Sequence, residues 1–158
     1  MNSPSIVVER IYGLPSGFSQ LLSDSLEQNF GALEALFQNF ESGKNTFNRR
    51  GEALFAAFIG NTVVGIGGLN VDPYANDPKI GRIRHLYVLI DYHKGGVGRA
   101  LVSAIEQCAL EHFDSLQLFT NSPDADAFYR SLGYQLGGEG KSSHFKDIGQ
   151  TENEVIVK

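Results

Sequence analysis

The chain has 158 residues, 42% of them hydrophobic and 20% charged, which is enough apolar material for one packed domain over residues 1–158. Its formal net charge of −5 argues against broad binding to nucleic acid or to an anionic membrane surface. The lone cysteine, Cys108, excludes an intrachain disulfide, no apolar run could span a bilayer, and the first ten residues lack a secretory signal, so we expect a cytoplasmic protein.

Hydrophobic periodicity divides the chain into strand and helix signals. In chain order we expect a strand at 5–10, one or two helices over 18–40, strands at 53–59, 62–71 and 80–90, a helix at 98–113, a strand at 115–120, a helix at 123–132, and strands at 134–136, 144–148 and 154–157. Gly31 lies near a helix break, Gly60-Asn61 suits a hairpin turn, and the glycines of 65–68 indicate a bulge or a close backbone approach. Hairpins followed by β-α-β units predict a mixed α/β fold with helices flanking the sheet. The pairing of the C-terminal strands stays open.

The connection between the strand at 80–90 and the helix at 98–113 has the features of an anion site. Its turn reads His93-Lys94-Gly95-Gly96-Val97-Gly98-Arg99. Glycines let backbone amides approach a ligand, and the first amides of a helix lack acceptors and carry partial positive charge. Lys94 and Arg99 add full charges, so the turn suits a pyrophosphate. The turn lacks the Lys-Ser/Thr of a P-loop, and Leu101 stands where a dinucleotide fingerprint needs glycine or alanine. A glycine-rich connector without a ligand is the alternative.

This segment resembles motif A of the GNAT superfamily of N-acetyltransferases, whose pattern is Gln/Arg-x-x-Gly-x-Gly/Ala. Residues 93–98 match it with His93 in place of Gln or Arg, and Leu86-Tyr87-Val88 resembles the family's fourth strand. The resemblance implies a mixed, largely antiparallel sheet flanked by helices and splayed between the fourth and fifth strands. It also implies that the main chain of Leu86, Tyr87 and Val88 binds the pantetheine arm of acetyl-coenzyme A (acetyl-CoA), while amides of residues 93–99 hold its pyrophosphate.

Residues 120–134, TNSPDADAFYRSLGY, resemble motif B of the same family, a helix with the pattern Ala-x-x-Phe-Tyr-x-x-x-Gly-Phe/Tyr. A proline at the helix start and Gly133 past its end also obey independent capping rules. The resemblance implies that Tyr129 lies against the cofactor and donates a proton to the leaving thiolate. It further implies that Asn121 reaches the cofactor through its side-chain amide. Without the motif, Tyr129 would be taken for a packing tyrosine and Asn121 for a turn residue.

Acetyl transfer to an amine needs a neutral amine, a main-chain amide that faces the thioester carbonyl, and an acid for the leaving thiolate. The amide near Val88 and the phenol of Tyr129 are what the resemblance implies for the last two. The expected fourth strand holds no carboxylate, so His85 is the candidate base, with Glu27, Glu34 or an ordered water as alternatives. A strand histidine without a catalytic role is equally compatible with His85.

The acceptor amine is expected to bind between the helices of 18–40 and the loop of 72–79. Tyr74 could pack against it, and a group of carboxylates could attract it as a cation: Glu27, Glu34, Asp72 and Asp77. The four histidines lack ligand spacing and the single cysteine has no partner, so we expect no metal.

The leading hypothesis is an acetyl-CoA-dependent N-acetyltransferase that acts on a primary amine of a small molecule or peptide by direct attack in a ternary complex. A non-catalytic module that senses acyl-CoA is the main alternative, and a nucleotide-binding protein of another class is the third. We expect neither nucleic acid nor a membrane as partner, and the resemblance implies that a homodimer could form.

Overall fold

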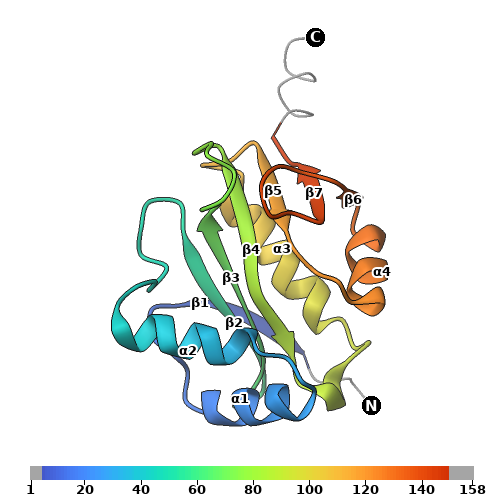
Figure 1. Ribbon diagram of the computed structural model, residues 1–158. Helices are drawn as coiled ribbons and strands as arrows, with labels where there is room; N and C mark the ends of the chain where they lie inside the picture. The colour runs from blue at the N-terminus through green and yellow to red at the C-terminus, as the bar shows by residue number, and fades with distance from the viewer. Residues whose placement is uncertain (1–4, 150–158) are drawn as a thin grey trace.

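The computed structural model describes residues 5–149, in which seven strands form one sheet (Figure 1). The strands are β1 (Ile6–Ile11), β2 (Ala53–Ile59), β3 (Thr62–Val71), β4 (Ile80–Val88), β5 (Ser115–Leu118), β6 (Gln135–Leu136) and β7 (His144–Asp147). The helices are α1 (Phe18–Glu27), α2 (Ala32–Ser42), α3 (Val97–Ala109) and α4 (Pro123–Ser131), with a short 3-10 helix η1 (Ile90–Tyr92). The strand order is β1-β2-β3-β4-β5-β7-β6; β4 and β5 run parallel and the other neighbours antiparallel.

The central strands alternate between two cores, one on each face of the sheet. On β2, Ala53, Phe55 and Ala57 pack with α3, whereas Leu54 and Ala56 pack with α1 and α2. Successive side chains of a strand point to opposite faces, so a strand covered on both faces needs the nearly continuous apolar run seen here. Figure 1 shows α3 behind the sheet and α1 and α2 in front of it.

A β-bulge interrupts β4 at His85 and Leu86, which together oppose Gly67 of β3. His85 has a backbone φ of 61°, which is uncommon for a residue other than glycine and is one of the conformations found in bulges. The extra residue changes which face the following residues occupy. Ile83 packs with α3, but Tyr87, four residues later, packs with α1 and α2. In a regular strand these two side chains would share a face.

Strands β4 and β5 are paired only where they begin. Residues 80–82 of β4 pair with residues 115–117 of β5. Residues 83–88 of β4 find no strand on that side among the described residues, and β5 ends at Leu118, with β7 paired along its other edge. The expected splay between the fourth and fifth strands is confirmed, and it leaves a strand edge in the interior of the sheet.

Most expected elements are confirmed with ends that shift by one or two residues, but the helix expected to end at residue 113 ends at Ala109. The region 18–40 forms two helices that part around Gly31, and Gly60 and Asn61 join β2 to β3. A Cβ atom on Gly67 would lie 2.8 Å from Cδ1 of Leu86, which is the close approach expected of the glycines at 65–68. The C-terminal pairing is resolved by β7, which lies between β5 and β6. The strand expected at 154–157 lies outside the described residues.

No helix within residues 5–149 is long and apolar enough to cross a membrane.

Candidate active site

The unpaired half of β4 presents main-chain hydrogen-bonding groups to the gap beside β5. The amide of Leu89 donates to the carbonyl oxygen of Val64 on β3 (2.9 Å), and Tyr87 lies opposite Ile66 of the same strand. Main-chain groups of successive strand residues alternate in direction, so Val88 directs its N–H and C=O away from β3. A free strand edge can pair with an extended chain. The gap therefore suits an extended ligand that carries amide groups of its own.

Tyr87, expected at this edge, and His93, expected at the pyrophosphate, are placed differently from the sequence interpretation. Tyr87 turns its main-chain groups toward β3 and its hydroxyl toward Asp24, so its main chain is not free to pair with an arm in the gap. The imidazole of His93 donates from Nε2 to the carbonyl oxygen of Val88 (2.8 Å), and the amide of His93 bonds to the carbonyl of Ile90 (3.3 Å). His93 thus occupies an acceptor that the sequence interpretation assigned to the pantetheine arm.

The start of α3 is a helix terminus without a cap. Gly96 is the N-cap residue, with φ 93°, and no side chain accepts from the first turn. Among the described residues, the amides of residues 94–99 have no hydrogen-bond acceptor, and the first bond of the helix runs from Ala100 to Gly96 (3.0 Å). Lys94 and Arg99 are exposed, and neither forms an ion pair with a described carboxylate. Unpaired amides, the helix dipole and two cations together form an anion site.

Helix α4 lies directly against the start of α3. Ser122 caps it by accepting from the amide of Ala125 (3.3 Å), and Gly133 follows its end with φ 96°, as the capping pattern predicted. A Cβ atom on Gly98 would lie 3.1 Å from the ring of Phe128, a tight contact that shows how closely the two helices approach. The two sequence motifs therefore meet in space.

The ring of Tyr129 on α4 is buried. The residue is 6% exposed, and its ring contacts those of Phe128, Tyr134 and His144 at centroid distances of 5.0, 5.4 and 6.2 Å. Its hydroxyl forms no hydrogen bond with the other described residues. Burial raises the pKa of Tyr129, which keeps the phenol protonated near neutral pH.

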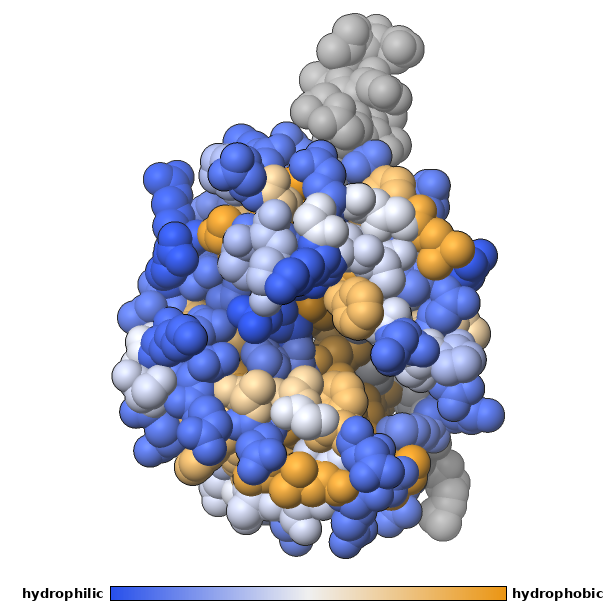
Figure 2. All heavy atoms as spheres, viewed as in Figure 1, coloured by the Kyte–Doolittle hydropathy of each residue, from blue (hydrophilic) through white to orange (hydrophobic). Residues whose placement is uncertain are grey.

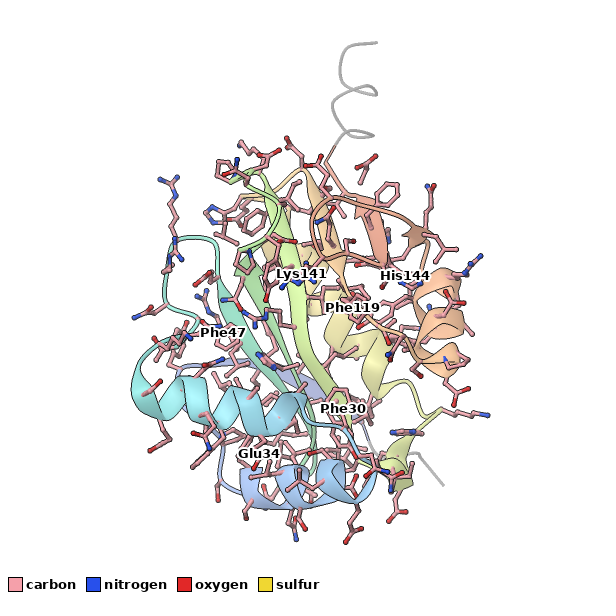
Figure 3. All side chains as sticks on the ribbon, in the orientation of Figure 1. Phe30, Glu34, Phe47, Phe119, Lys141 and His144 are labelled. Atoms are coloured by element: carbon pink, nitrogen blue, oxygen red, sulfur yellow. The ribbon has the colours of Figure 1, made fainter. Side chains whose placement is uncertain are left out.

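A buried histidine fixes α4 to the end of β5 and to β7. His144 places Nε2 2.7 Å from Oδ1 of Asp126 and Nδ1 2.8 Å from Oγ of Ser143 (Figure 3). Oγ of Ser143 also accepts from the amide of Thr120 (2.9 Å). The hydrogen bond from His144 is the main reason that the pKa of Asp126 is lowered. Through these contacts the helix that carries Tyr129 is held in place. The next residue after Thr120, Asn121, is exposed.

His85 lies under the start of α2 and is 8% exposed. Its Nδ1 is 2.8 Å from the carbonyl oxygen of Ala32, so Nδ1 carries the proton, and Nε2 is buried with no hydrogen-bond partner within residues 5–149. The ring of Phe47 stands edge-on at 6.1 Å. Burial, and then the charge of Arg84, lower the pKa of His85 to about 4. At neutral pH the imidazole is therefore uncharged, with an unprotonated Nε2.

The sequence model of the acetyltransferase (GNAT) family matches residues 18–134, the part of the chain that contains the β4 edge, the α3 terminus and α4. The chain belongs to the GNAT family of acetyltransferases. The GNAT protein is similar to a protein of Exiguobacterium sp. 255-15, described provisionally as an acetyltransferase: 31% identity, TM-score 0.82, covering 98% of this chain and 99% of that one. It shares its fold with an acetyltransferase of Streptococcus agalactiae (18% identity, TM-score 0.68, 90% and 98% covered) and with PH1933 of Pyrococcus horikoshii (19%, 0.68, 90% and 98%). No curated protein matches.

Family membership makes this GNAT protein an N-acyltransferase that takes an acyl group from acyl-CoA and transfers it to an amine. The matched region includes the start of α3, where the amides of residues 94–99 have no hydrogen-bond acceptor among the described residues. Among the described residues, no group of three or more His, Cys, Asp or Glu side chains is placed to hold a metal ion.

Sequence reasoning missed a carboxylate that joins α1 to the end of β4. Asp24 of the GNAT protein accepts from the hydroxyl of Tyr87 (2.5 Å) and from the amide of Ile90 (3.0 Å). Burial, and then the bond to Asp24, raise the pKa of Tyr87. The aromatic ring of Tyr87 also stacks on Phe30 at 5.2 Å. A helix carboxylate 63 residues before its partner has no local signal, so only the fold reveals this contact.

A second cluster was also missed and corrects the expectation for Asp72. This carboxylate, with 0% of its side chain exposed, pairs with Arg82 (2.9 Å) and accepts from Gln117 (3.0 Å) and from the amide of Tyr74 (2.8 Å). Arg82 in turn donates to the carbonyl of Lys141, and Gln117 exchanges hydrogen bonds with the main chain of Glu139. Asp72 therefore holds two loops on the sheet and is not available to attract an amine.

Proposed function

We propose that this GNAT protein transfers an acetyl group from acetyl-CoA to a primary amine of a small molecule or peptide by direct attack in a ternary complex. One observation carries the proposal. The interior edge of β4 leads, through η1, into the uncapped start of α3, so an edge for an extended amide chain ends at a site for a diphosphate. Acetyl-CoA has both groups in that order and supplies a thioester-activated acetyl group.

The donor is held mainly by main-chain atoms. The N–H and C=O of Val88 pair with the pantetheine arm once the imidazole of His93 leaves that carbonyl, and an amide of the same unpaired stretch of β4 polarises the thioester carbonyl. The amides of residues 94–99 bind the diphosphate, with the charges of Lys94 and Arg99 beside them. Asn121 contributes its side-chain amide from the far side of the gap.

Tyr129 protonates the departing thiolate. Its hydroxyl forms no hydrogen bond with the other described residues and stays protonated at neutral pH, so it can donate a hydrogen bond to the thiolate as the C–S bond breaks, and pass its proton to that sulfur. The ring is held by the aromatic contacts of α4, so the acid requires little reorganisation when the bond breaks.

His85 is our candidate for the group that accepts the amine proton. Its Nε2 is unprotonated and unpaired, and the imidazole lies on the face of the sheet covered by α1 and α2. A pKa of about 4 makes it a weak base, so His85 would relay the proton and not store it. The other carboxylate candidates, Glu27 and Glu34, are exposed on α1 and α2.

The test combines turnover and donor binding. We expect Tyr129→Phe to lower kcat by about 10²- to 10⁴-fold, the range for loss of a general acid, while the Kd for acetyl-CoA measured by calorimetry stays the same. Tyr12→Phe is the matched control, because Tyr12 is exposed and far from α4 in the fold. If Tyr129→Phe turned over at the wild-type rate, Tyr129 would not be the general acid. Tighter binding of ATP or NAD than of acetyl-CoA would contradict the donor site itself.

A further inference from the structure

A cavity of about 380 Å³ opens where β4 and β5 part, on the face of the sheet opposite α3. Its lining comes from the loop after β3, from β4, from the end of β5 and from the loop between β6 and β7: Tyr74, Arg82, Phe119, Gly140, Lys141 and Ser142. Figure 2 shows this face of the molecule hollowed near its centre, with hydrophilic residues around the hollow. The volume is at the lower end of the range of about 300–1,000 Å³ for small-molecule sites, which favours a compact ligand.

Two aromatic rings give the cavity its apolar character. Two cations lie near the ring of Tyr74, with the guanidinium carbon of Arg82 at 4.8 Å and Nζ of Lys141 at 5.0 Å from the ring centroid. Phe119 is 61% exposed, a large apolar surface for a residue that directly follows a buried strand. Figure 3 shows Phe119 and Lys141 close together in front of the sheet, and both line the cavity.

The charge of the cavity is positive. Arg82 is 5% exposed and its charge is matched by Asp72 at 2.9 Å, so this pair contributes no net charge. Lys141 is exposed and has no carboxylate within ion-pair distance among the described residues. Its contact with the Tyr74 ring is worth only about 0.5–1 kcal/mol at an exposed site, so an anion can compete for the ammonium group. No acidic side chain lines the cavity.

The cavity also lies next to the proposed reaction centre. Arg82 pairs with Gln117 in the last paired step of β4 and β5, and the unpaired stretch begins one residue later. A ligand in the cavity can therefore extend an amine into the gap where the thioester would lie.

From these observations we propose that the acceptor is a compact amine that carries a carboxylate and an apolar or aromatic group, as an apolar amino acid does. The carboxylate binds the ammonium group of Lys141, and the apolar group lies between Tyr74 and Phe119. Polyamines and aminoglycosides, which bring several positive charges, do not fit this charge. The inference rests on the proposed acetyl transfer and names the substrate class of the same site.

The experiment follows thiol release from acetyl-CoA with L-phenylalanine, its amide and spermidine as acceptors. Wild type is compared with Lys141→Met and with Lys44→Met, which removes an exposed lysine that does not line the cavity. We expect Lys141→Met to lower kcat/KM for phenylalanine by about tenfold, the effect of one charged hydrogen bond, and to leave the amide within twofold. Each acceptor is compared with itself across the variants, so differences between the acceptors in amine pKa cancel.

Equal losses on phenylalanine and its amide, or an effect of Lys44→Met as large as that of Lys141→Met, would overturn the carboxylate contact. Turnover of spermidine with none of phenylalanine would overturn the substrate class while acetyl transfer stood. Absence of thiol release with all three acceptors and with a wider amine panel, although acetyl-CoA binds, would instead refute the proposed function and this inference with it.

Discussion

Lowering the pH should destabilise the protein through His85. Burial holds the pKa of this imidazole at about 4, against 6.5 for the free side chain. Between these values the unfolded chain binds a proton that the folded protein excludes, so stability is complete above pH 6.5 and is lost as the pH falls toward 4. At about 1.36 kcal/mol per pH unit, the full loss is about 3 kcal/mol. This is a large part of the roughly 5–15 kcal/mol that stabilises a typical domain.

His85→Asn isolates this contribution. Asparagine tolerates the positive φ of 61°, and its side-chain amide can replace the Nδ1 donor to the carbonyl of Ala32, but it has no group that titrates in this range. Urea unfolding followed by circular dichroism at several values between pH 4.5 and 7.5 gives the free energy of unfolding for both proteins. We expect wild type to lose stability faster than the variant as the pH falls. Parallel curves would refute the buried, uncharged state of His85.

Three further variants test the cluster and the donor site. Arg82→Met should lower the free energy of unfolding by about 3–5 kcal/mol in urea titration, because it leaves the carboxylate of Asp72 buried without its cation; a loss below about 1 kcal/mol would contradict that view. Gly96→Ala should lose about 1–2 kcal/mol by the same assay from its φ of 93° alone, since the nearest atom to the new Cβ would be 3.8 Å away; no loss would show that the turn can rearrange. His93→Ala should tighten acetyl-CoA binding in calorimetry by about 2- to 10-fold, because it frees the carbonyl of Val88. Weaker binding would instead indicate that the His93 imidazole contacts acetyl-CoA.

The fold was largely predictable because its signals are local. A glycine turn marks the start of α3, and a serine cap, a proline and a following glycine mark the two ends of α4. The alternation of apolar residues separates strands from helices. The anion-binding character of the turn from Lys94 to Arg99 was predictable for the same reason, because it depends on glycines that directly precede a helix. The roles of Tyr129 and Asn121 came from the family motif and stay predictions.

What the sequence could not show depends on contacts between distant residues. The bulge at His85 arises from the pairing of β4 with β3, and it decides that Tyr87 faces Asp24 and that His85 faces α2. The opposing charges of Asp72 and Arg82 stand ten residues apart on a loop and a strand, so their pairing is visible only once the hairpin is formed. From the sequence alone, Asp72 was therefore expected to be free to attract a substrate amine, although in the structure it is paired with Arg82.

The proposed donor site consists of backbone groups, and this has a consequence for how the protein tolerates substitutions. Replacing a side chain does not remove an N–H or a C=O, so most substitutions along the gap and the turn should leave acyl-CoA recognition intact. Sensitivity should be confined to positions that set the path of the chain, above all Gly96, and Gly98 where α4 approaches. The proposed acceptor cavity is lined instead by side chains, most of them on loops, so substitutions there can alter the choice of amine while the use of the acyl carrier persists.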